Sequence, residues 1–315
     1  MSEIGLNQRP IGRRRSDRIV GASRAHQRVV EKASTASRVE LPVVISGPAG
    51  SGKEHLSRAI HAWSDRAAEA FVIVSCGAIN ESLIAREIFG CTKGVYPLLA
   101  DEYAGALTRA AGGTVLIDEF DQLPELPRKS LITALSDGTF QREGDTAPIP
   151  MRARVIASAA SLSSPSPLGE LEVQNIELLS LRERSEDVLP LAAHLLRLAA
   201  DEAGVKAVGF TSDARDALLA EPWPGNVREL AERIRQAVLL VGDGAISAEA
   251  LLLAGDPDEV PSFKEAKRAF ETRYVVGLLR RCGGNISRAA RLAKKDRKDF
   301  YDVIRRTGVN PSEFR

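Results

Sequence analysis

A glycine-rich stretch, GPAGSGKE at residues 47–54, has the residue types and spacing of a loop that wraps phosphate groups. Glycines let the backbone turn its N–H groups toward phosphate oxygens, and Lys53 can neutralise the β- and γ-phosphates of a nucleoside triphosphate. A hydroxyl residue usually follows such a lysine, but Glu54 stands there, so a plain glycine-rich turn is the alternative. The candidate nucleotide-contacting residues are Gly47, Gly50, Ser51, Gly52, Lys53 and Glu54.

Two acidic residues end a hydrophobic run further along the chain, in GGTVLIDEF at residues 112–120. At the carboxyl end of a parallel strand beside a phosphate loop, Asp118 can hold Mg²⁺ through water and Glu119 can polarise an attacking water molecule. An acidic pair can also be a simple solvated strand end. Because a phosphate loop precedes it, we interpret the pair as part of a nucleotide site, with Mg as the expected metal.

Short apolar runs alternate with helical patterns over residues 19–182, and this alternation would bring both motifs to one edge of a sheet. Runs rich in valine and isoleucine predict strands at residues 41–46, 71–75, 114–118 and 154–158. Helical spacing is found between them, at residues 52–63, 81–89 and 127–138. Continuous apolar strands that alternate with helices predict an α/β core in which a parallel sheet is flanked by helices.

Composition divides the rest of the chain into further segments. Residues 1–18 form a basic leader. After residue 182 only helical patterns follow, which predicts a small all-α lid over residues 183–253. Residues 254–261 are an acidic, proline-containing linker, and residues 262–315 form a C-terminal module with three predicted helices.

The net charge of +1 conceals a basic C-terminal module. Residues 262–315 hold 15 Lys or Arg against 6 Asp or Glu. This balance indicates a polyanion partner such as double-stranded DNA, although a solvated basic helical face would have the same composition. The three cysteines lie far apart and form neither a disulfide nor a zinc framework. No signal peptide or membrane span is predicted, so we expect a cytoplasmic protein without a membrane partner.

Two short helices joined by a turn are predicted at residues 283–314. Asn285 can cap the first helix and Asp296 the second. The residues expected to face inward are Ala289, Ala290, Leu292, Phe300, Val303 and Ile304. The preceding helix has an apolar stripe, which we interpret as a dimer face, through Phe270, Tyr274, Val275 and Leu278.

The outward face of the second helix has the residue types that read DNA. N-terminal residues of a recognition helix meet base edges in the major groove, while flanking cations meet phosphates. We therefore expect Arg297, Lys298 and Tyr301 to contact bases. The candidate DNA-binding residues are Arg297, Lys298, Tyr301, Arg305, Lys294 and Lys295. A basic three-helix bundle that binds protein is the alternative.

Several motifs resemble those of the bacterial enhancer-binding proteins, the AAA+ activators of sigma-54 RNA polymerase. They are IVGASRAHQRVVEKA, FGCTKG, LRERSEDVLPLA, WPGNVREL and the C-terminal helix pair. The resemblance implies a P-loop AAA+ core with an all-α lid and a C-terminal Fis-type helix-turn-helix. In this family Glu often stands where Glu54 does. The family also implies that Arg228 reaches from the lid to the γ-phosphate; a surface pair with Glu232 is the alternative.

The sequence departs from the family pattern in two elements that act between molecules. The polymerase-contact loop, GAFTGA in the family, reads GVYPLL at residues 94–99, and Pro97 restricts its backbone. The family carries arginines that reach a neighbour's γ-phosphate just before LRER. Here no arginine occurs from residue 161 to 181, and the best-aligned residues are Ser164 and Glu170.

Two further departures concern the water-activating machinery. The Thr-Asn pair of the family's first sensor is Ala159-Ala160, and the Asn that holds the catalytic glutamate is Ser75, whose reach toward Glu119 is shorter. Losing transition-state contacts lowers the rate while sparing ground-state binding. We therefore expect a protein that binds ATP and hydrolyses it slowly or not at all.

These observations favour a sequence-specific DNA-binding transcription regulator that is at most a slow ATPase. It would act in a homo- or hetero-oligomer, with RNA polymerase holoenzyme or a homologous AAA+ regulator as partner. It would either belong to a mixed ring or act independently of sigma-54. A fully active ATPase that remodels sigma-54 polymerase is one alternative. A DNA-bound scaffold or anti-activator is the other.

Overall fold

The structure is a computed structural model of the 315-residue chain. It describes residues 19–96, 101–161, 168–253, 275–276, 278–279, 282–293, 295–307 and 309–311, with the backbone alone at residues 252, 253 and 297. The chain divides into two units, Met1–Leu251 and Leu252–Arg315, and each is described by itself. Within the described residues, no helix is long and apolar enough to cross a membrane.

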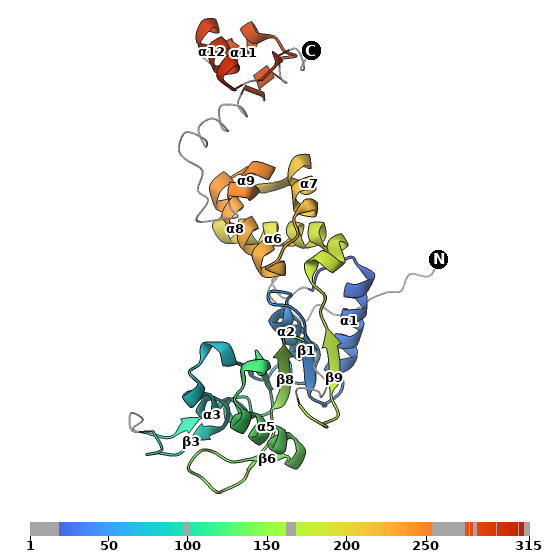
Figure 1. Cartoon of the computed structure of the whole chain (residues 1–315), viewed down its shortest axis with the longest axis vertical. Helices are drawn as coiled ribbons and strands as arrows, with labels where there is room; N and C mark the ends of the chain where they lie inside the picture. The colour runs from blue at the N-terminus through green and yellow to red at the C-terminus, as the bar shows by residue number, and fades with distance from the viewer. Residues whose placement is uncertain are drawn as a thin grey trace, which may run out of the picture. The chain divides into compact units, whose positions relative to one another are not determined.

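A five-stranded parallel sheet forms the centre of the first unit (Figure 1). Its order is β2 (Phe71–Ser75), β5 (Thr114–Asp118), β8 (Arg154–Ala159), β1 (Val43–Ser46) and β9 (Gln174–Glu177). The four predicted strands are therefore confirmed, and they are neighbours. The edge strand β9 was not predicted, because Ile176 is the buried residue in an otherwise polar or exposed stretch.

Helices cover both faces of the sheet, because successive strand residues point to opposite sides. Val43 and Ile45 of β1 pack on one side with residues of α1 and α2, whereas Val44 packs on the other side with residues of α3, α4 and α5. The helices are α1 (Arg24–Ser37), α2 (Lys53–Trp63), α3 (Glu81–Phe89), α4 (Ala106–Arg109) and α5 (Glu125–Asp137). This layered arrangement brings the carboxyl ends of β1, β5 and β8 to one edge, where open parallel sheets bind ligands.

Two short antiparallel pairs are inserted into the α/β alternation. They are β3 (Gly90–Cys91) with β4 (Tyr103–Ala104), and β6 (Thr139–Phe140) with β7 (Ile149–Pro150). The two insertions are joined through Glu143, whose carbonyl accepts from the Thr92 N–H at 2.9 Å and whose N–H donates to the Gly90 carbonyl at 2.9 Å.

The lid is helical, as predicted, but the expectation of helices alone was incomplete. Its elements are η4 (Leu181–Asp187), α6 (Val188–Ala203), α7 (Ser212–Ala220), α8 (Asn226–Val241) and α9 (Ala248–Leu253). In addition, β10 (Ala207–Phe210) pairs in parallel with β11 (Gly244–Ile246). Both strands are short and glycine-containing, so neither produces a recognisable strand pattern in the sequence.

The second unit contains the two predicted short helices, α11 (Ile286–Leu292) and α12 (Arg297–Thr307). The Asn285 side chain accepts from the Arg288 N–H at 3.1 Å, and Asp296 accepts from the Lys298 N–H at 2.8 Å, so both predicted caps are confirmed. The Phe300 and Ile304 side chains are buried against Ala289 and Ala290.

For this unit, the expectations for Leu292, Val275 and Leu278 need correction, and two further residues lie outside the described part of the chain. Leu292 is 55% exposed rather than packed, because α11 ends there and its buried face is formed by the two alanines. Val275 is fully buried in the unit's own core and Leu278 packs against that core, so these two residues are used internally rather than left as a dimer face. Phe270 and Tyr274 lie outside the described residues.

Candidate nucleotide site

The glycine-rich loop joins β1 to α2 at the carboxyl edge of the sheet. Gly50 and Gly52 have φ angles of 71° and 106°, in the left-handed region that glycine adopts without strain. A Cβ at Gly50 would lie 2.2 Å from the Gly225 carbonyl oxygen. A Cβ at Gly52 would have no heavy atom of the described residues within 4 Å apart from its chain neighbours and its own helix. The first N–H groups of α2 have no intrahelical acceptor, so this open turn suits an anion such as phosphate.

The Lys53 ammonium lies inside this loop. Its Nζ donates to the carbonyl oxygens of Gly47 at 2.7 Å and Pro48 at 3.2 Å. Burial lowers the pKa of Lys53, while the nearby carboxylates of Asp118, Asp121 and Glu119 act in the opposite direction. The lysine is thus held between the loop and an acidic cluster, where phosphate oxygens could replace its carbonyl partners.

Two further residues of the loop, Ser51 and Glu54, have contacts of their own in this structure. Glu54 forms an ion pair with Arg58 at 2.9 Å and is half exposed along α2. The hydroxyl of Ser51 is buried without a hydrogen-bond partner, while its carbonyl accepts from Arg184.

The acidic pair stands at the end of β5, on the strand beside β8. The Ser158 hydroxyl, fully buried on β8, donates to Asp118 Oδ1 and accepts the N–H of Glu119 at 3.0 Å. The Glu119 carboxylate rests against the backbone of Gly77, because a Cβ there would lie 2.0 Å from Oε2. Ser75 pairs in register with Asp118, but the described residues contain no hydrogen bond from Ser75 to Glu119.

The two alanines at the first-sensor position offer backbone groups only. Ala159 is buried, and its carbonyl accepts from the Gly47 N–H at 3.2 Å. The Ala160 N–H donates to Asp121 Oδ2 at 2.6 Å. This end of β8 therefore braces the loop and the acidic cluster, and the side chain that it contributes is the hydroxyl of Ser158.

The lid contacts the glycine-rich loop through the start of α8. The N–H groups of Val227 and Arg228 donate to the Gly50 carbonyl at 3.0 and 3.2 Å. Asn226, buried and with a φ of 56°, donates to the Ala49 carbonyl at 2.9 Å and accepts from the Leu181 N–H at 2.8 Å. Sequence reasoning missed Asn226, although it directly follows the glycine of the WPGN turn.

The Arg228 side chain is exposed beside this junction. It makes no ion pair within the described part of the chain, and Glu232 accepts from Arg235 at 2.7 Å and from Gln236 at 2.7 Å instead. The charge of Arg228 lowers the pKa of Lys53. The alternative surface pair with Glu232 is therefore absent, and the guanidinium lies within electrostatic reach of the loop lysine.

A second connection runs from the lid through two buried charges. Arg184 Nη2 donates to the Ser51 carbonyl at 2.9 Å, and Asp187 lies 3.8 Å from Arg184 Nη1. Asp187 is fully buried and accepts from the N–H groups of Ala22 at 2.6 Å and Ser23 at 2.7 Å. Residues 22–23, the lid and the loop are thereby joined. Sequence reasoning missed both charged residues, although LRERSED contains them.

The segment at the position of the family's polymerase-contact loop is anchored at its start. The Tyr96 hydroxyl donates to Glu143 Oε2 at 2.7 Å, and the Arg86 guanidinium lies 5.4 Å from the Tyr96 ring centroid. Residues 97–99 lie outside the described residues, as does Ser164. Glu170 is described and is exposed.

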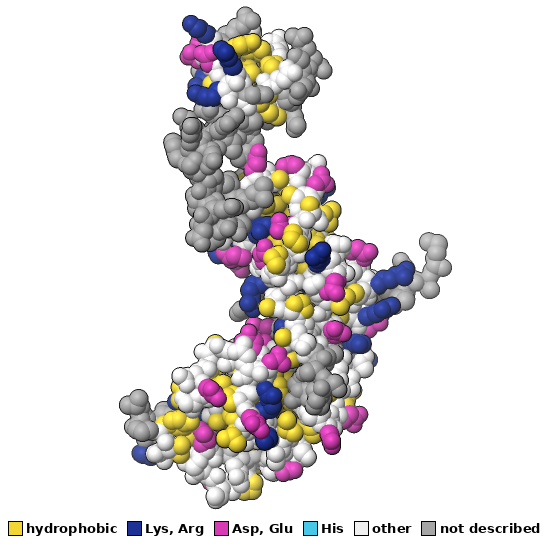
Figure 2. All heavy atoms as spheres, viewed as in Figure 1, with side chains coloured by type: hydrophobic (Ala, Val, Ile, Leu, Met, Phe, Trp, Pro, Cys, Tyr) yellow, Lys and Arg dark blue, Asp and Glu magenta, His cyan; other side chains and the backbone are white. Residues whose placement is uncertain are grey.

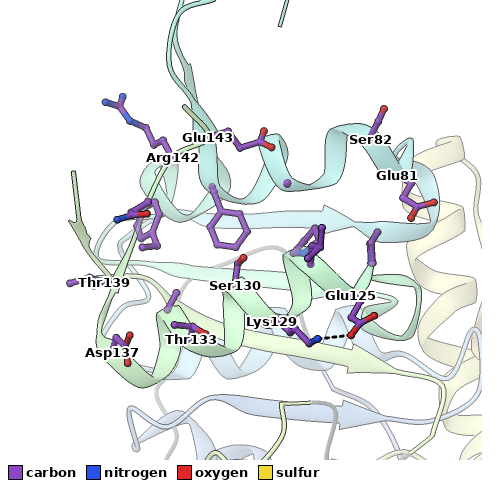
Figure 3. A pocket seen from close by; sticks show the side chains of 18 of the residues that line it. Glu81, Ser82, Glu125, Lys129, Ser130, Thr133, Asp137, Thr139, Arg142 and Glu143 are labelled. Carbon is purple, nitrogen blue, oxygen red and sulfur yellow. Dashed lines mark hydrogen bonds and ion pairs between the residues drawn. The ribbon is translucent and has the colours of Figure 1, made fainter. Parts of the chain in front are cut away.

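A groove of about 1230 Å³ lies between α3, α5 and the segment after β6 (Figure 3). Its lining contains neither the glycine-rich loop nor the acidic pair. Figure 3 shows that α5 contributes a row of side chains, with the Glu125–Lys129 ion pair marked. Four carboxylates and two cations line the groove, so its charge does not favour an anion such as a phosphate.

The candidate DNA-reading side chains stand on the solvent side of α12. Lys298, Tyr301 and Arg305 are exposed, and Lys295 is exposed in the preceding turn. Figure 2 shows exposed basic side chains on this unit. Arg297 begins α12, but only its backbone is described, and Lys294 lies outside the described residues.

The residues at the carboxyl edge fit a nucleotide with a metal ion. Gly52 leaves open space before the helix that Lys53 begins, and an acidic cluster faces the lysine. Asp118 has one oxygen, Oδ2, without a hydrogen bond in the described structure. A carboxylate oxygen can bind Mg²⁺ directly or accept a hydrogen bond from a water molecule bound to the metal.

Comparison with known proteins gives matches over most of the chain. Residues 19–167 match the family described as the sigma-54 interaction domain, and residues 182–262 match the AAA+ ATPase lid domain. Transcriptional regulatory protein GlrR of Escherichia coli K12 is 33% identical over 309 residues, covering 94% of this chain and 69% of GlrR. ZraR of the same strain is 33% identical over 305 residues, covering 91% of this chain and 68% of ZraR.

Solved structures of a protein named NtrX are also similar to this chain over most of its length. NtrX from Brucella abortus in complex with ADP has a TM-score of 0.65 and 28% identity, and the match covers 93% of this chain and 69% of NtrX. In complex with ATP it has a TM-score of 0.66 and 27% identity, with 93% and 71% covered.

Proposed function

Because this chain belongs to the family of sigma-54-dependent transcriptional regulators, we propose that it is a DNA-binding regulator that binds ATP and hydrolyses it slowly or not at all. The observation that carries nucleotide binding is the position of Lys53, which lies in an open phosphate loop within electrostatic reach of the carboxylates of Asp118 and Glu119. The lid contacts the same loop at the Gly50 carbonyl. NtrX, crystallised with ADP and with ATP, supports nucleotide binding by this type of domain.

The phosphate loop and the lid would hold the nucleotide together. Lys53 and the N–H groups at the start of α2 would neutralise the phosphates, and Arg228 would approach the terminal phosphate from the lid. Asp118 would hold Mg²⁺ through water. The metal ion, when bound, would neutralise charge on the phosphates. Glu119 would orient the attacking water.

Slow hydrolysis follows from the groups that this site lacks. Ala159 and Ala160 have no side-chain donor, Ser75 makes no hydrogen bond to Glu119 in the described structure, and Glu170 would bring a negative charge where a partner's arginine is expected. An arginine finger contributes about 10³–10⁵ in rate in other phosphoryl-transfer systems. Binding depends on groups that are present, so affinity and turnover separate.

The C-terminal unit would bind double-stranded DNA through α12. Lys298 and Tyr301 are exposed near the start of that helix, where side chains of a recognition helix meet base edges. Lys295 and Arg305, also exposed, would meet phosphates. The regulator would act in an oligomer with RNA polymerase holoenzyme or a homologous AAA+ regulator, and a partner with intact arginines could complete its site.

Measuring ATP binding and turnover against protein concentration tests this proposal. We expect the wild type to bind ATP with Mg²⁺ and to turn over well below the rate of about 1 s⁻¹ at the low end for enzymes. Lys53→Ala should abolish binding, whereas Lys32→Ala, an exposed lysine on α1, should not. A wild-type turnover of about 1 s⁻¹ that rises with protein concentration would instead identify an active polymerase-remodelling ATPase. DNA affinity without nucleotide affinity would identify a scaffold or anti-activator.

A further inference from the structure

Ser158 connects the two acidic residues of the candidate site. Its hydroxyl donates to Asp118 Oδ1 and accepts the Glu119 N–H at 3.0 Å. The residue is fully buried on β8. This strand lies between β5, which ends at Asp118 of the acidic pair, and β1, which leads into the glycine-rich loop. A buried hydroxyl costs free energy unless it is hydrogen-bonded, and both partners of this hydroxyl belong to the acidic pair.

Ser158 supplies the polar side chain that the end of β8 contributes to the site, because the residues around it are alanines. Ala157 and Ala159 flank it, and Ala160 follows with its N–H bonded to Asp121. The strand end thus contributes one polar side chain, and that side chain bonds to Asp118 rather than pointing to solvent. The hydrogen bond occupies Oδ1 and leaves Oδ2 without a hydrogen bond in the described structure.

We propose that Ser158 is a positioning residue for metal-dependent nucleotide binding, because it holds the Asp118 carboxylate with Oδ2 available and fixes the backbone at Glu119. This inference rests on the proposed function. Groups that orient a metal-binding carboxylate typically contribute about 10–100-fold to metal affinity or activity. Ser158 touches neither phosphate nor metal in this role, so its loss should alter the dependence on Mg²⁺ and leave metal-free binding intact.

A matched control lies on the adjacent strand. Ser46 ends β1, is 1% exposed and has a hydroxyl without a hydrogen-bond partner in the described structure. Its strand pairs directly with β8, with Ser46 opposite Ala159. Ser158→Ala and Ser46→Ala therefore remove the same atom from equally buried strand positions, and they differ in whether that atom bonds to Asp118.

The experiment measures ATP affinity of the full chain in EDTA and across a Mg²⁺ titration. For Ser158→Ala we expect unchanged affinity in EDTA and a half-saturating Mg²⁺ concentration raised by about 10-fold or more. Ser46→Ala should match the wild type in both conditions. Ser158→Thr, which keeps a hydroxyl, should keep more of the Mg²⁺ response than Ser158→Ala, and this variant serves where the alanine variant fails to fold.

The outcomes separate the two proposals. A Ser158→Ala protein that matches Ser46→Ala, or that loses affinity equally with and without Mg²⁺, overturns the positioning role alone. A wild type that binds ATP in neither condition overturns the proposed nucleotide function, and the positioning role with it.

Discussion

The guanidinium of Arg184 donates from Nη2 to the backbone carbonyl of Ser51, 2.9 Å away across the boundary between lid and phosphate loop. The arginine is 6% exposed, and desolvation by burial lowers its pKa. Such a bond uses a charged donor on a loop that must keep its shape to wrap phosphate. Through this bond the lid holds the backbone of the loop that we propose to bind nucleotide.

Arg184→Lys keeps the charge but removes the planar donor, and we expect it to weaken ATP binding by about 10-fold, since hydrogen bonds to charged groups contribute about 1.5–3 kcal/mol. Isothermal titration of the full chain measures this change. Arg235→Lys, whose exposed ion pair with Glu232 is expected to contribute little, is the matched control. Equal affinities of the two variants would show that the Ser51 contact is dispensable.

Asp187 is expected to dominate the stability of the same junction. Its fully buried carboxylate accepts three hydrogen bonds from residues 22–23 and neighbours Arg184. Asp187→Ala leaves these donors and a buried arginine without their partner, so we expect a loss of about 3–5 kcal/mol in the free energy of unfolding. Urea denaturation measures it. Asp216→Ala, an exposed aspartate on α7, should change that free energy by less than about 0.5 kcal/mol.

These connections mark the limit of what the sequence alone predicts. Local patterns predicted the strand that ends at Asp118 and the helix that begins at Lys53, because apolar runs and turn glycines are local signals. The Asp187–Ser23 contact joins residues 164 positions apart, and no local pattern specifies which buried charge meets which backbone group. Ser158 was missed for the same reason, since its hydrogen-bond partners lie on or directly after the neighbouring strand.

Acid should destabilise the first unit through His61. This histidine is buried with Nδ1 3.0 Å from the Thr114 hydroxyl, and burial is the main cause that lowers its pKa below 6.5. The unfolded chain binds the proton at a higher pH than the folded one, so this stability is present above about pH 6.5 and is lost as the pH falls.

Free energies of unfolding at neutral pH and at pH values below the ordinary histidine pKa check this expectation. His61→Gln should be less stable at neutral pH but should lose less stability on acidification than the wild type, because glutamine does not titrate. An identical acid-induced loss in both proteins would assign the effect to other groups, of which His26, whose pKa burial also lowers, is the next to replace.

Glu170→Arg tests whether a missing intermolecular arginine limits turnover. Glu170 is exposed, and the resemblance to the family aligns it best with one of the arginines expected to reach a neighbour's nucleotide. If slow hydrolysis results from this loss, the variant should raise the ATPase rate by about 10-fold or more, a fraction of the 10³–10⁵ that such fingers contribute elsewhere. The increase should appear only at concentrations at which the protein oligomerises. Glu172→Arg, also exposed, is the control, and a gain there of the same size would argue for a general charge effect.

The C-terminal unit shows which part of a helix-turn-helix prediction is secure. The caps by Asn285 and Asp296 were predicted from residue type and spacing, and both are present. Leu292 was misplaced because periodicity alone does not show where a short helix ends. Which exposed side chains touch bases depends on the docking of α12 on DNA, so that assignment stays a prediction.

Lys295 and Lys298 should affect DNA binding differently, although both are exposed lysines three residues apart. Lys295 precedes α12 and would contact a phosphate, so Lys295→Ala should weaken binding to all sequences alike and reduce the slope of log K against log salt by about one.

Lys298 is the second residue of α12 and would contact a base. Lys298→Ala should therefore cost about 1–3 kcal/mol on the preferred site and much less on random DNA. Fluorescence anisotropy at several salt concentrations measures both effects, with Lys206→Ala in the first unit as the control. Equal losses on preferred and random DNA for Lys298→Ala would place that lysine on the phosphate backbone instead.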